Sequence, residues 1–150
     1  MSERALADHP FTAGLSEDDL MRLAACVVGR SEWRPGESVL TRGQPTDVFH
    51  LIVDGRIAIE IREPGSDPRT IQTIHGGDLL GWSWLFEPYR WTFDARATAT
   101  TSAITLDSDL VRRSIEADPR FGLAIVERVM RAIMSRLEAT RLQVLDVYGS

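Results

Sequence analysis

The chain has 150 residues, 43% of them apolar, which is enough for a single domain with a substantial core. Its formal net charge of −5 argues against a nucleic-acid partner, because affinity for a phosphate backbone rests mainly on clustered positive charge. Its 17 basic residues are all arginine, which excludes a P-loop lysine, a Schiff-base lysine and a lysine general base.

The cellular location is predicted from features that the sequence lacks. Cys26 is the single cysteine, so no internal disulfide can form. The N-terminus has no basic region followed by an apolar run and a cleavage site, and no segment approaches membrane-spanning length. We therefore expect a cytoplasmic protein with no membrane partner.

After a short polar lead, the sequence predicts one helix near the N-terminus. Ser16 precedes three acidic residues, which is typical of a helix N-cap with negative charge at the positive end of the helix dipole. The spacing predicts a helix from about Glu17 to Val28, and Gly29 ends it. Its apolar positions fall on one face, which comprises Leu20, Leu23, Ala24 and Val27.

From Trp33 the apolar pattern has a period of two, and turn residues recur every several positions. Asp54 and Gly55 predict a tight hairpin between two of the strands. The predicted strands are residues 38–41, 49–53, 57–61, 70–74, 95–101 and 103–106. Many short strands at this spacing indicate a mainly β fold with flanking helices, and we predict an eight-stranded jelly-roll β-barrel.

The stretch 77–97 lies between two β-like regions and holds three of the four tryptophans. Gly81 allows a close backbone approach or a positive φ, and the residues after it predict one short helical turn. We interpret the stretch as a pocket wall, in which arginines would pair with an anionic ligand. The candidate ligand-binding residues are Gly81, Trp82, Ser83, Trp84, Arg90, Trp91, Thr92 and Arg96. The alternative, in which the aromatic residues are simply core, stays open.

The last third of the chain is predicted to be helical. Residues 107–109 cap a short helix that runs through Ile115, residues 118–119 break it, and a long helix follows to about Val147. Apolar or small residues in the long helix have heptad spacing, at Val126, Met130, Ile133, Leu137, Thr140, Val144 and Val147. We predict a parallel homodimer whose interface includes Val126, Met130, Ile133, Leu137 and Val144. A helix that packs only on its own sheet is the alternative.

Catalytic and metal-binding patterns are not found. His9, His50 and His75 are isolated, and no His-x-His pair exists, whereas metal chemistry in a β-barrel needs several converging histidines and a carboxylate. We expect ordinary strand roles for His50 and His75. The sequence predicts no catalytic residue, no metal, no cofactor and no enzymatic activity.

The order of these elements resembles the cyclic nucleotide-binding domain family, the sensory half of bacterial regulators of the catabolite-activator and oxygen-sensing type. The resemblance is carried by short motifs at residues 9–11, 14–16, 35–37, 42–45, 49–52, 54–56, 77–81 and 96–97. It implies one domain over residues 1–150, with a helical lead at 1–30, a barrel at 31–107, a phosphate-binding cassette at 77–97 and C-terminal helices at 108–150.

The cassette departs from the pattern that the resemblance implies for cyclic nucleotide binding. A glutamate that takes the ribose hydroxyl should follow the cassette glycine, and Trp82 stands there. Trp91 and Thr92 stand where the phosphate arginine and its neighbour should be, Arg90 is one place off, and Arg96 aligns with a different, strand-borne arginine. A hydroxyl buried without its acceptor lowers affinity, so we expect no ordinary cAMP binding.

Three classes of function follow. The first is a non-catalytic regulatory or accessory module that acts through protein contacts, either as a homodimer or as a subunit of a larger complex. Accessory subunits of bacterial redox complexes, including nicotinamide-reducing hydrogenases, are similar to stand-alone domains of this kind. The second is a sensor for another nucleotide or an aromatic anion, held by Arg90, Arg96 and the tryptophans. The third, a cupin-like enzyme, is disfavoured by the isolated histidines.

A transcription factor of the family would continue from the long helix into a helix-turn-helix domain. The sequence ends at Ser150, a few residues after the predicted helix. If the 150 residues are the whole protein, we expect no direct regulation of DNA.

Overall fold

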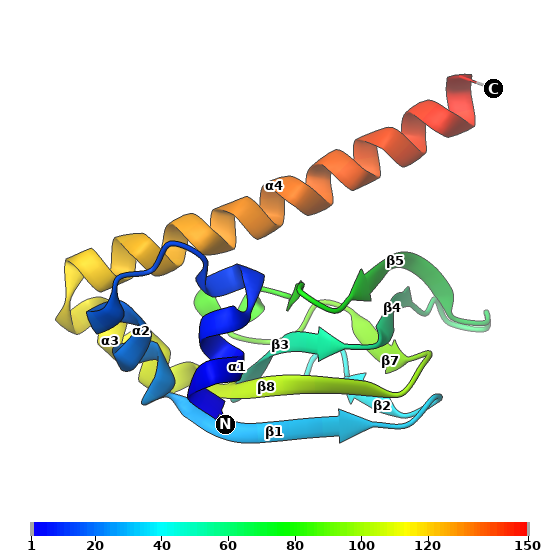
Figure 1. Cartoon of the computed structure of the whole chain (residues 1–150). Coiled ribbons are helices and arrows are strands. Elements are labelled where there is room, and N and C mark those ends of the chain that lie inside the picture. Colours follow the sequence, from blue (N-terminus) through cyan, green and yellow to red (C-terminus); the bar gives the residue numbers. More distant parts are fainter. Residues whose placement is uncertain (1, 150) are drawn as a thin grey trace.

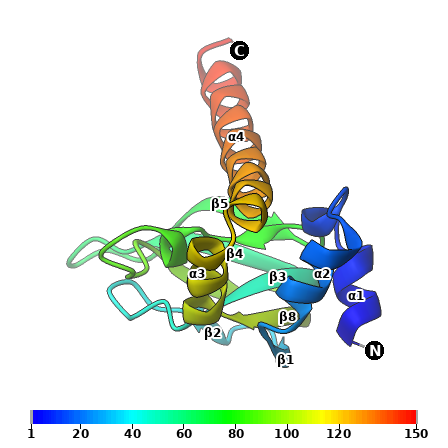
Figure 2. The ribbon, with the colours of Figure 1, turned by 90° about the vertical axis from the view of Figure 1, so that its left-hand side faces the viewer.

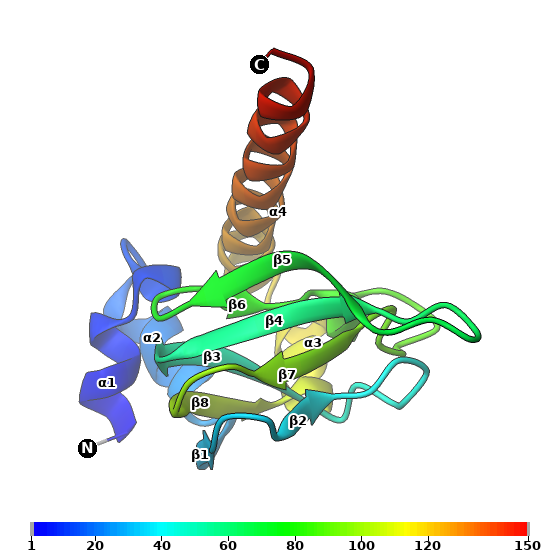
Figure 3. The ribbon, with the colours of Figure 1, turned by 90° about the vertical axis from the view of Figure 1, so that its right-hand side faces the viewer.

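The structure is a computed structural model that describes residues 2–149, with side chains described for residues 5–141. Eight strands form two antiparallel sheets of four strands each, which face one another (Figure 1 and Figure 3). The first sheet has the order β1 (Val27–Trp33), β8 (Thr101–Asp107), β3 (Val48–Asp54) and β6 (Leu79–Leu80). The second has the order β2 (Ser38–Leu40), β7 (Asp94–Ala97), β4 (Arg56–Ile61) and β5 (Arg69–His75). The predicted eight-stranded jelly roll is confirmed.

Helices cover one end and one side of the two sheets (Figure 2). The N-terminal lead contains α1 (Ser2–Asp8), a 3₁₀ turn η1 (Pro10–Thr12) and α2 (Glu17–Ala24). A second 3₁₀ turn, η2 (Ser83–Leu85), lies between β6 and β7. The C-terminal part consists of α3 (Ser108–Ala117) and the long α4 (Pro119–Gly149), which passes over the barrel and continues beyond it (Figure 1). No helix in residues 2–149 is long and apolar enough to cross a membrane.

The first predicted helix begins where expected but ends earlier than predicted. The Ser16 hydroxyl accepts a hydrogen bond from the Asp19 amide at 3.1 Å, which confirms the N-cap. The helix ends at Ala24, and Val27 already pairs with Leu106 as the first residue of β1. Strand pairing with β8 provides hydrogen bonds that a longer helix would not, so tertiary context overrides the local helical spacing.

The strand boundaries near the C-terminal end of the barrel also differ from the prediction. The predicted strand at 95–101 is divided, because β7 ends at Ala97 and the chain turns before β8 begins at Thr101. The Thr101 hydroxyl donates to the Ala99 carbonyl at 2.9 Å and thereby stabilises this turn. The short β6, formed when residues 79–80 pair with β3, was not predicted.

The core lies between the sheets and continues under the helices. Phe49, His50, Leu51 and Ile52 are consecutive and all buried, so β3 is covered on both faces and the simple alternation predicted for it is wrong. The two C-terminal helices agree with the prediction, since Asp107 accepts from the Leu110 amide and caps α3. This arrangement places η2, β5 and α4 around one hollow.

Candidate functional site

The cassette, residues 77–97, contains a glycine that no other residue could replace without strain. Gly81 follows β6 directly and has a φ of +78°. A Cβ atom built on it would lie 2.8 Å from the ring of Trp91 and 3.1 Å from the ring of Phe93. Both the left-handed backbone and the close packing therefore require glycine at this position.

The short helical turn after Gly81 is confirmed as η2. Its central residue, Trp84, anchors the cassette to the core. Trp84 is fully buried, and its ring stacks on Phe49 with a centroid separation of 3.8 Å. Its indole N–H donates to the Gly81 carbonyl at 3.1 Å. The structure therefore places Trp84 in the core. This agrees with the alternative interpretation, in which the aromatic residues of the cassette are core residues.

The loop after η2 is held from two sides. The Tyr89 carbonyl accepts from the amide of Thr46 at 3.0 Å and from its hydroxyl at 3.1 Å. The Arg112 guanidinium lies 4.1 Å from the centre of the Tyr89 ring, and it also donates to the Trp84 carbonyl at 2.6 Å. Arg112 comes from α3, and nothing in its local sequence indicated a role in the cassette.

Both predicted arginines are engaged with the protein itself. The Arg90 side chain is exposed and donates to the Gly43 carbonyl at 2.9 Å. Arg96 forms a two-point pair with Glu60, at 2.9 Å and 3.3 Å, in which the Glu60 side chain is only 9% exposed. Arg96 therefore neutralises a buried carboxylate on β4 and does not line the hollow beside the cassette.

Trp91 is buried and fixed by backbone bonds on both sides. Its amide donates to the Gln44 carbonyl at 3.1 Å, and its carbonyl accepts from the Gly43 amide at 2.8 Å. Its ring lies against Gly81, at the position where the resemblance implies a phosphate-binding arginine. An indole offers no positive charge to a phosphate, so this position cannot form the family's usual ion pair.

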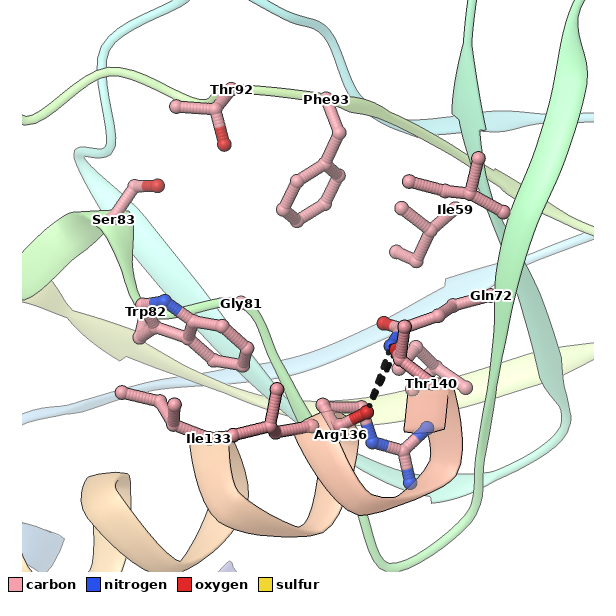
Figure 4. A pocket seen from close by; sticks show the side chains of 13 residues that line it. Ile59, Gln72, Gly81, Trp82, Ser83, Thr92, Phe93, Ile133, Arg136 and Thr140 are labelled. Carbon is pink, nitrogen blue, oxygen red and sulfur yellow. Dashed lines mark hydrogen bonds between the residues drawn. The ribbon is translucent and has the colours of Figure 1, made fainter. Parts of the chain in front are cut away.

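A cavity of about 410 Å³ lies between the cassette, the β4–β5 hairpin and α4 (Figure 4). This volume is within the usual range of small-molecule sites. The lining residues are Ile59, Ile71, Gln72, Ile74, Gly81, Trp82, Ser83, Thr92, Phe93, Ile133, Arg136, Leu137 and Thr140. The cavity is thus mainly apolar, with a few hydroxyl and amide groups and one guanidinium.

Polar contacts between β5 and α4 close one side of the cavity. The Gln72 amide donates to the Thr140 hydroxyl at 3.2 Å and to the Arg136 carbonyl at 3.4 Å. The Arg136 guanidinium donates to the Thr73 carbonyl at 3.2 Å and lies 3.8 Å from the Asp78 carboxylate. These contacts hold the helix against the sheet.

The structure brings half of the predicted ligand-binding residues to the cavity. Gly81, Trp82, Ser83 and Thr92 line it, whereas Trp84, Arg90, Trp91 and Arg96 have the other positions described above. The prediction missed Phe93 and every contribution from β5 and α4. The heptad seam in the sequence is the one signal for α4; it predicts a dimer interface, with a helix packed on its own sheet as the alternative, and neither interpretation assigns α4 to a ligand cavity.

The predicted seam on α4 divides between two faces. Ile133 packs against the core, whereas Met130 is 54% exposed and Leu137 59% exposed. Val126 is half-buried, and the side chain of Val144 lies outside the described residues. Among the α4 residues whose side chains are described, the large apolar side chains left in solvent are Leu123, Met130, Met134 and Leu137, which we call the exposed stripe.

Two buried histidines are structural in their contacts. The His9 ring accepts from the Phe11 amide at 3.1 Å and donates to the Ile52 carbonyl at 2.7 Å, and burial lowers its pKa. His50 bonds the Thr105 hydroxyl at 2.9 Å, and burial lowers its pKa to about 4. No three His, Cys, Asp or Glu side chains among the described residues lie together as a metal site.

Comparison with known proteins agrees with this geometry. The family model described as the cyclic nucleotide-binding domain matches residues 30–118. The chain is similar to a CRP-like cAMP-activated global transcriptional regulator of Mycobacterium tuberculosis, with 26% identity over 112 residues, 75% of this chain and 48% of that protein. The chain therefore spans about half the length of this curated relative.

Two further matches cover most of the chain. It is 29% identical over 141 residues to glutaminase 1 of Bradyrhizobium diazoefficiens, a match over 94% of this chain and 21% of the glutaminase. A crystal structure of a putative cyclic nucleotide-binding protein from Geobacter metallireducens has the same fold, with a TM-score of 0.81 and 22% identity. That comparison covers 91% of this chain and 98% of the Geobacter chain.

Proposed function

The chain belongs to the cyclic nucleotide-binding domain family, and from this premise we propose that it is a non-catalytic regulatory module with two properties. It does not hold a cyclic nucleotide in the family's usual way. It pairs with a second copy of itself through α4.

The observation that carries the first part is the position of Trp91. Its buried ring packs against Gly81, where a cyclic phosphate would need a cation. The nearby arginines do not replace that cation, since Arg90 donates to a backbone carbonyl and Arg96 pairs with Glu60. A phosphate placed at this position would be desolvated without a charged partner, which is strongly unfavourable.

The exposed stripe supports the second part. Its four residues repeat at intervals of seven, four and three, so they lie along one side of α4. That side is distinct from the one that carries Ile125 and Val129 into the core. Several large apolar side chains in solvent along one side of a helix are typical of a protein interface, and a helix that extends beyond its own barrel can pair with its twofold copy.

Calorimetric titration with cAMP and cGMP tests the first part. We expect no heat of binding at ligand concentrations up to hundreds of micromolar, because neither Trp82 nor Trp91 supplies the hydrogen bonds of the missing glutamate and arginine. A dissociation constant in the micromolar range for either nucleotide would contradict the proposal.

A ligand sensor is the second candidate function, and the cavity under α4 favours it. The space is of ligand size and is bounded by the cassette on one side and by Ile133 and Leu137 of α4 on the other. A sensor would respond to another nucleotide, to an aromatic anion or to a different small molecule. The accessory role in a redox complex stays a prediction.

The larger relatives are compatible with a regulatory role. Glutaminase 1 has a segment similar to nearly the whole of this chain, and that segment is about a fifth of the protein. The mycobacterial regulator is matched over about half of its length. In both relatives the similar domain is therefore one part of a larger protein.

A further inference from the structure

The cavity beside the cassette has no uncommitted positive charge. Of its thirteen lining residues, Arg136 is the one with an ionisable side chain. Its guanidinium donates to the Thr73 carbonyl and lies next to the Asp78 carboxylate, at the edge of the cavity opposite Thr92 and Phe93 (Figure 4). The Asp78 carboxylate already balances part of this positive charge, so a buried anion gains less from Arg136 than from an unpaired arginine, which disfavours an anionic guest.

Two aromatic rings line the cavity. Trp82 and Phe93 border the open space from two sides in Figure 4, and Ile59 and Ile133 complete the apolar wall. Trp82 is only half-buried, so part of its ring faces the open space. Flat aromatic molecules pack well against such rings, either offset and stacked or edge to face.

Two hydroxyl groups give the cavity a polar corner. The Ser83 and Thr92 side chains both point into the open space in Figure 4, and neither hydroxyl has a partner among the described residues. A hydroxyl can either donate or accept, so the pair suits one uncharged polar substituent. The Gln72 amide is different, because it already bonds Arg136 and Thr140 of α4.

We propose that the cavity binds an uncharged, planar aromatic molecule with one polar substituent directed at Ser83 and Thr92. The inference rests on the proposed function in one respect, which is that the cassette does not hold a cyclic phosphate. It narrows the sensor hypothesis, since it removes the anionic ligands that Arg90 and Arg96 would have held.

A pair of fluorescent probes separates aromatic packing from charge. Phenylnaphthylamine is uncharged and brightens in apolar sites, and anilinonaphthalene sulfonate has the same ring system with an anionic group. We expect phenylnaphthylamine to bind at least tenfold more tightly than the sulfonate. A sulfonate that binds equally well or better, and that is lost in Arg136→Gln, overturns the proposal.

Variants that fill the cavity test its location. Ser83→Trp should weaken the binding of phenylnaphthylamine at least tenfold. Thr92→Trp, at an exposed position, gives a second variant that fills the same corner. Phe86→Trp adds an indole to the same cassette outside the cavity and should change the affinity less than twofold. Met134→Gln, on the exposed stripe, should also leave it unchanged.

Two results would overturn the proposal without touching the proposed function. One is that neither probe binds the unmutated chain. The other is that phenylnaphthylamine affinity falls in Met134→Gln and stays constant in Ser83→Trp and Thr92→Trp, which would place the probe on the exposed stripe. The proposed function fails on a separate measurement, calorimetric binding of cAMP or cGMP.

Discussion

The two walls of the cavity differ in what their polar groups are bonded to. On the wall formed by β5 and α4, Gln72 of β5 bonds α4 and Arg136 of α4 bonds β5. These bonds hold the helix on the barrel. On the cassette wall, the hydroxyls of Ser83 and Thr92 have no such partner within the described residues. The one charged group of the pocket therefore has a structural role, and the groups left to contact a ligand are aromatic or uncharged.

The largest expected effect concerns the outer side of α4, where the helix carries apolar groups instead of bonded polar ones. Met130→Asp and Met134→Asp should each convert a dimer into a soluble monomer. A buried large apolar side chain contributes roughly 1.5–3 kcal/mol, and each substitution occurs twice in a symmetric dimer. We therefore expect the dissociation constant to rise at least 100-fold in sedimentation measurements.

Ser135→Asp is the matched control for these variants. Ser135 is exposed on the same helix, next to Met134 in sequence, but it lies off the exposed stripe. It should sediment as the unmutated chain does. If the unmutated chain is itself a monomer at tens of micromolar, the homodimer is wrong, and a helix from another protein becomes the better interpretation of the stripe.

The second prediction sharpens the description of the cassette wall. Gly81→Ala should lower the free energy of unfolding by about 2–5 kcal/mol, from an unfavourable left-handed backbone together with overpacking against Trp91. Gly43→Ala is the control, because Gly43 has a φ of +86° but nothing within 4 Å of the added atom. It should cost about 1–2 kcal/mol in the same urea denaturation. Equal losses in the two variants would mean that the packing contributes nothing.

Much of the fold could be predicted from the sequence, and the errors have physical reasons. Asp54 and Gly55 favour a tight turn through their own local conformations, independently of tertiary contacts, so the start of β4 could be predicted. The end of α2 was wrong because Val27 and Val28 suit both a helix and a strand, and only pairing with β8 decides between them. β6 could not be predicted, because two residues are too few to show the alternation of apolar and polar side chains that indicates a strand.

The candidate site was predicted only where its chemistry is local. Gly81 to Ser83 follow one another, and a glycine followed by a tryptophan near a turn is visible in the sequence. The role of Arg96 depends on Glu60, which is 36 residues away in the chain, and the role of Arg136 depends on where α4 crosses the barrel. Such pairings are decided by tertiary contacts, so a list of nearby arginines could not assign them.

The third prediction concerns the barrel behind the cassette wall, where His50 and Trp91 border the same small hollow. Burial lowers the folded pKa of His50 from 6.5 to about 4, so the unfolded chain takes up a proton first as the pH falls. Stability present above about pH 6.5 is therefore lost toward pH 4, by up to roughly 3 kcal/mol. Urea denaturation at several pH values measures this loss.

His50→Gln should reduce that pH dependence, because glutamine can still bond Thr105 and does not titrate. A smaller slope will remain, since burial also lowers the pKa of His9. If the slope survives His50→Gln in full, the acid sensitivity comes from another group.

The smallest expected effect distinguishes a structural arginine from a ligand-binding one. Arg96→Ala leaves the Glu60 carboxylate buried without its partner, so the midpoint of thermal unfolding should fall modestly. The double variant Glu60→Gln with Arg96→Ala removes the buried charge as well and should recover most of the loss. Binding of phenylnaphthylamine should stay within twofold in both variants, because Arg96 does not line the cavity. Arg96 would instead be a ligand-binding residue if the affinity for phenylnaphthylamine falls in both variants while the unfolding midpoint does not change.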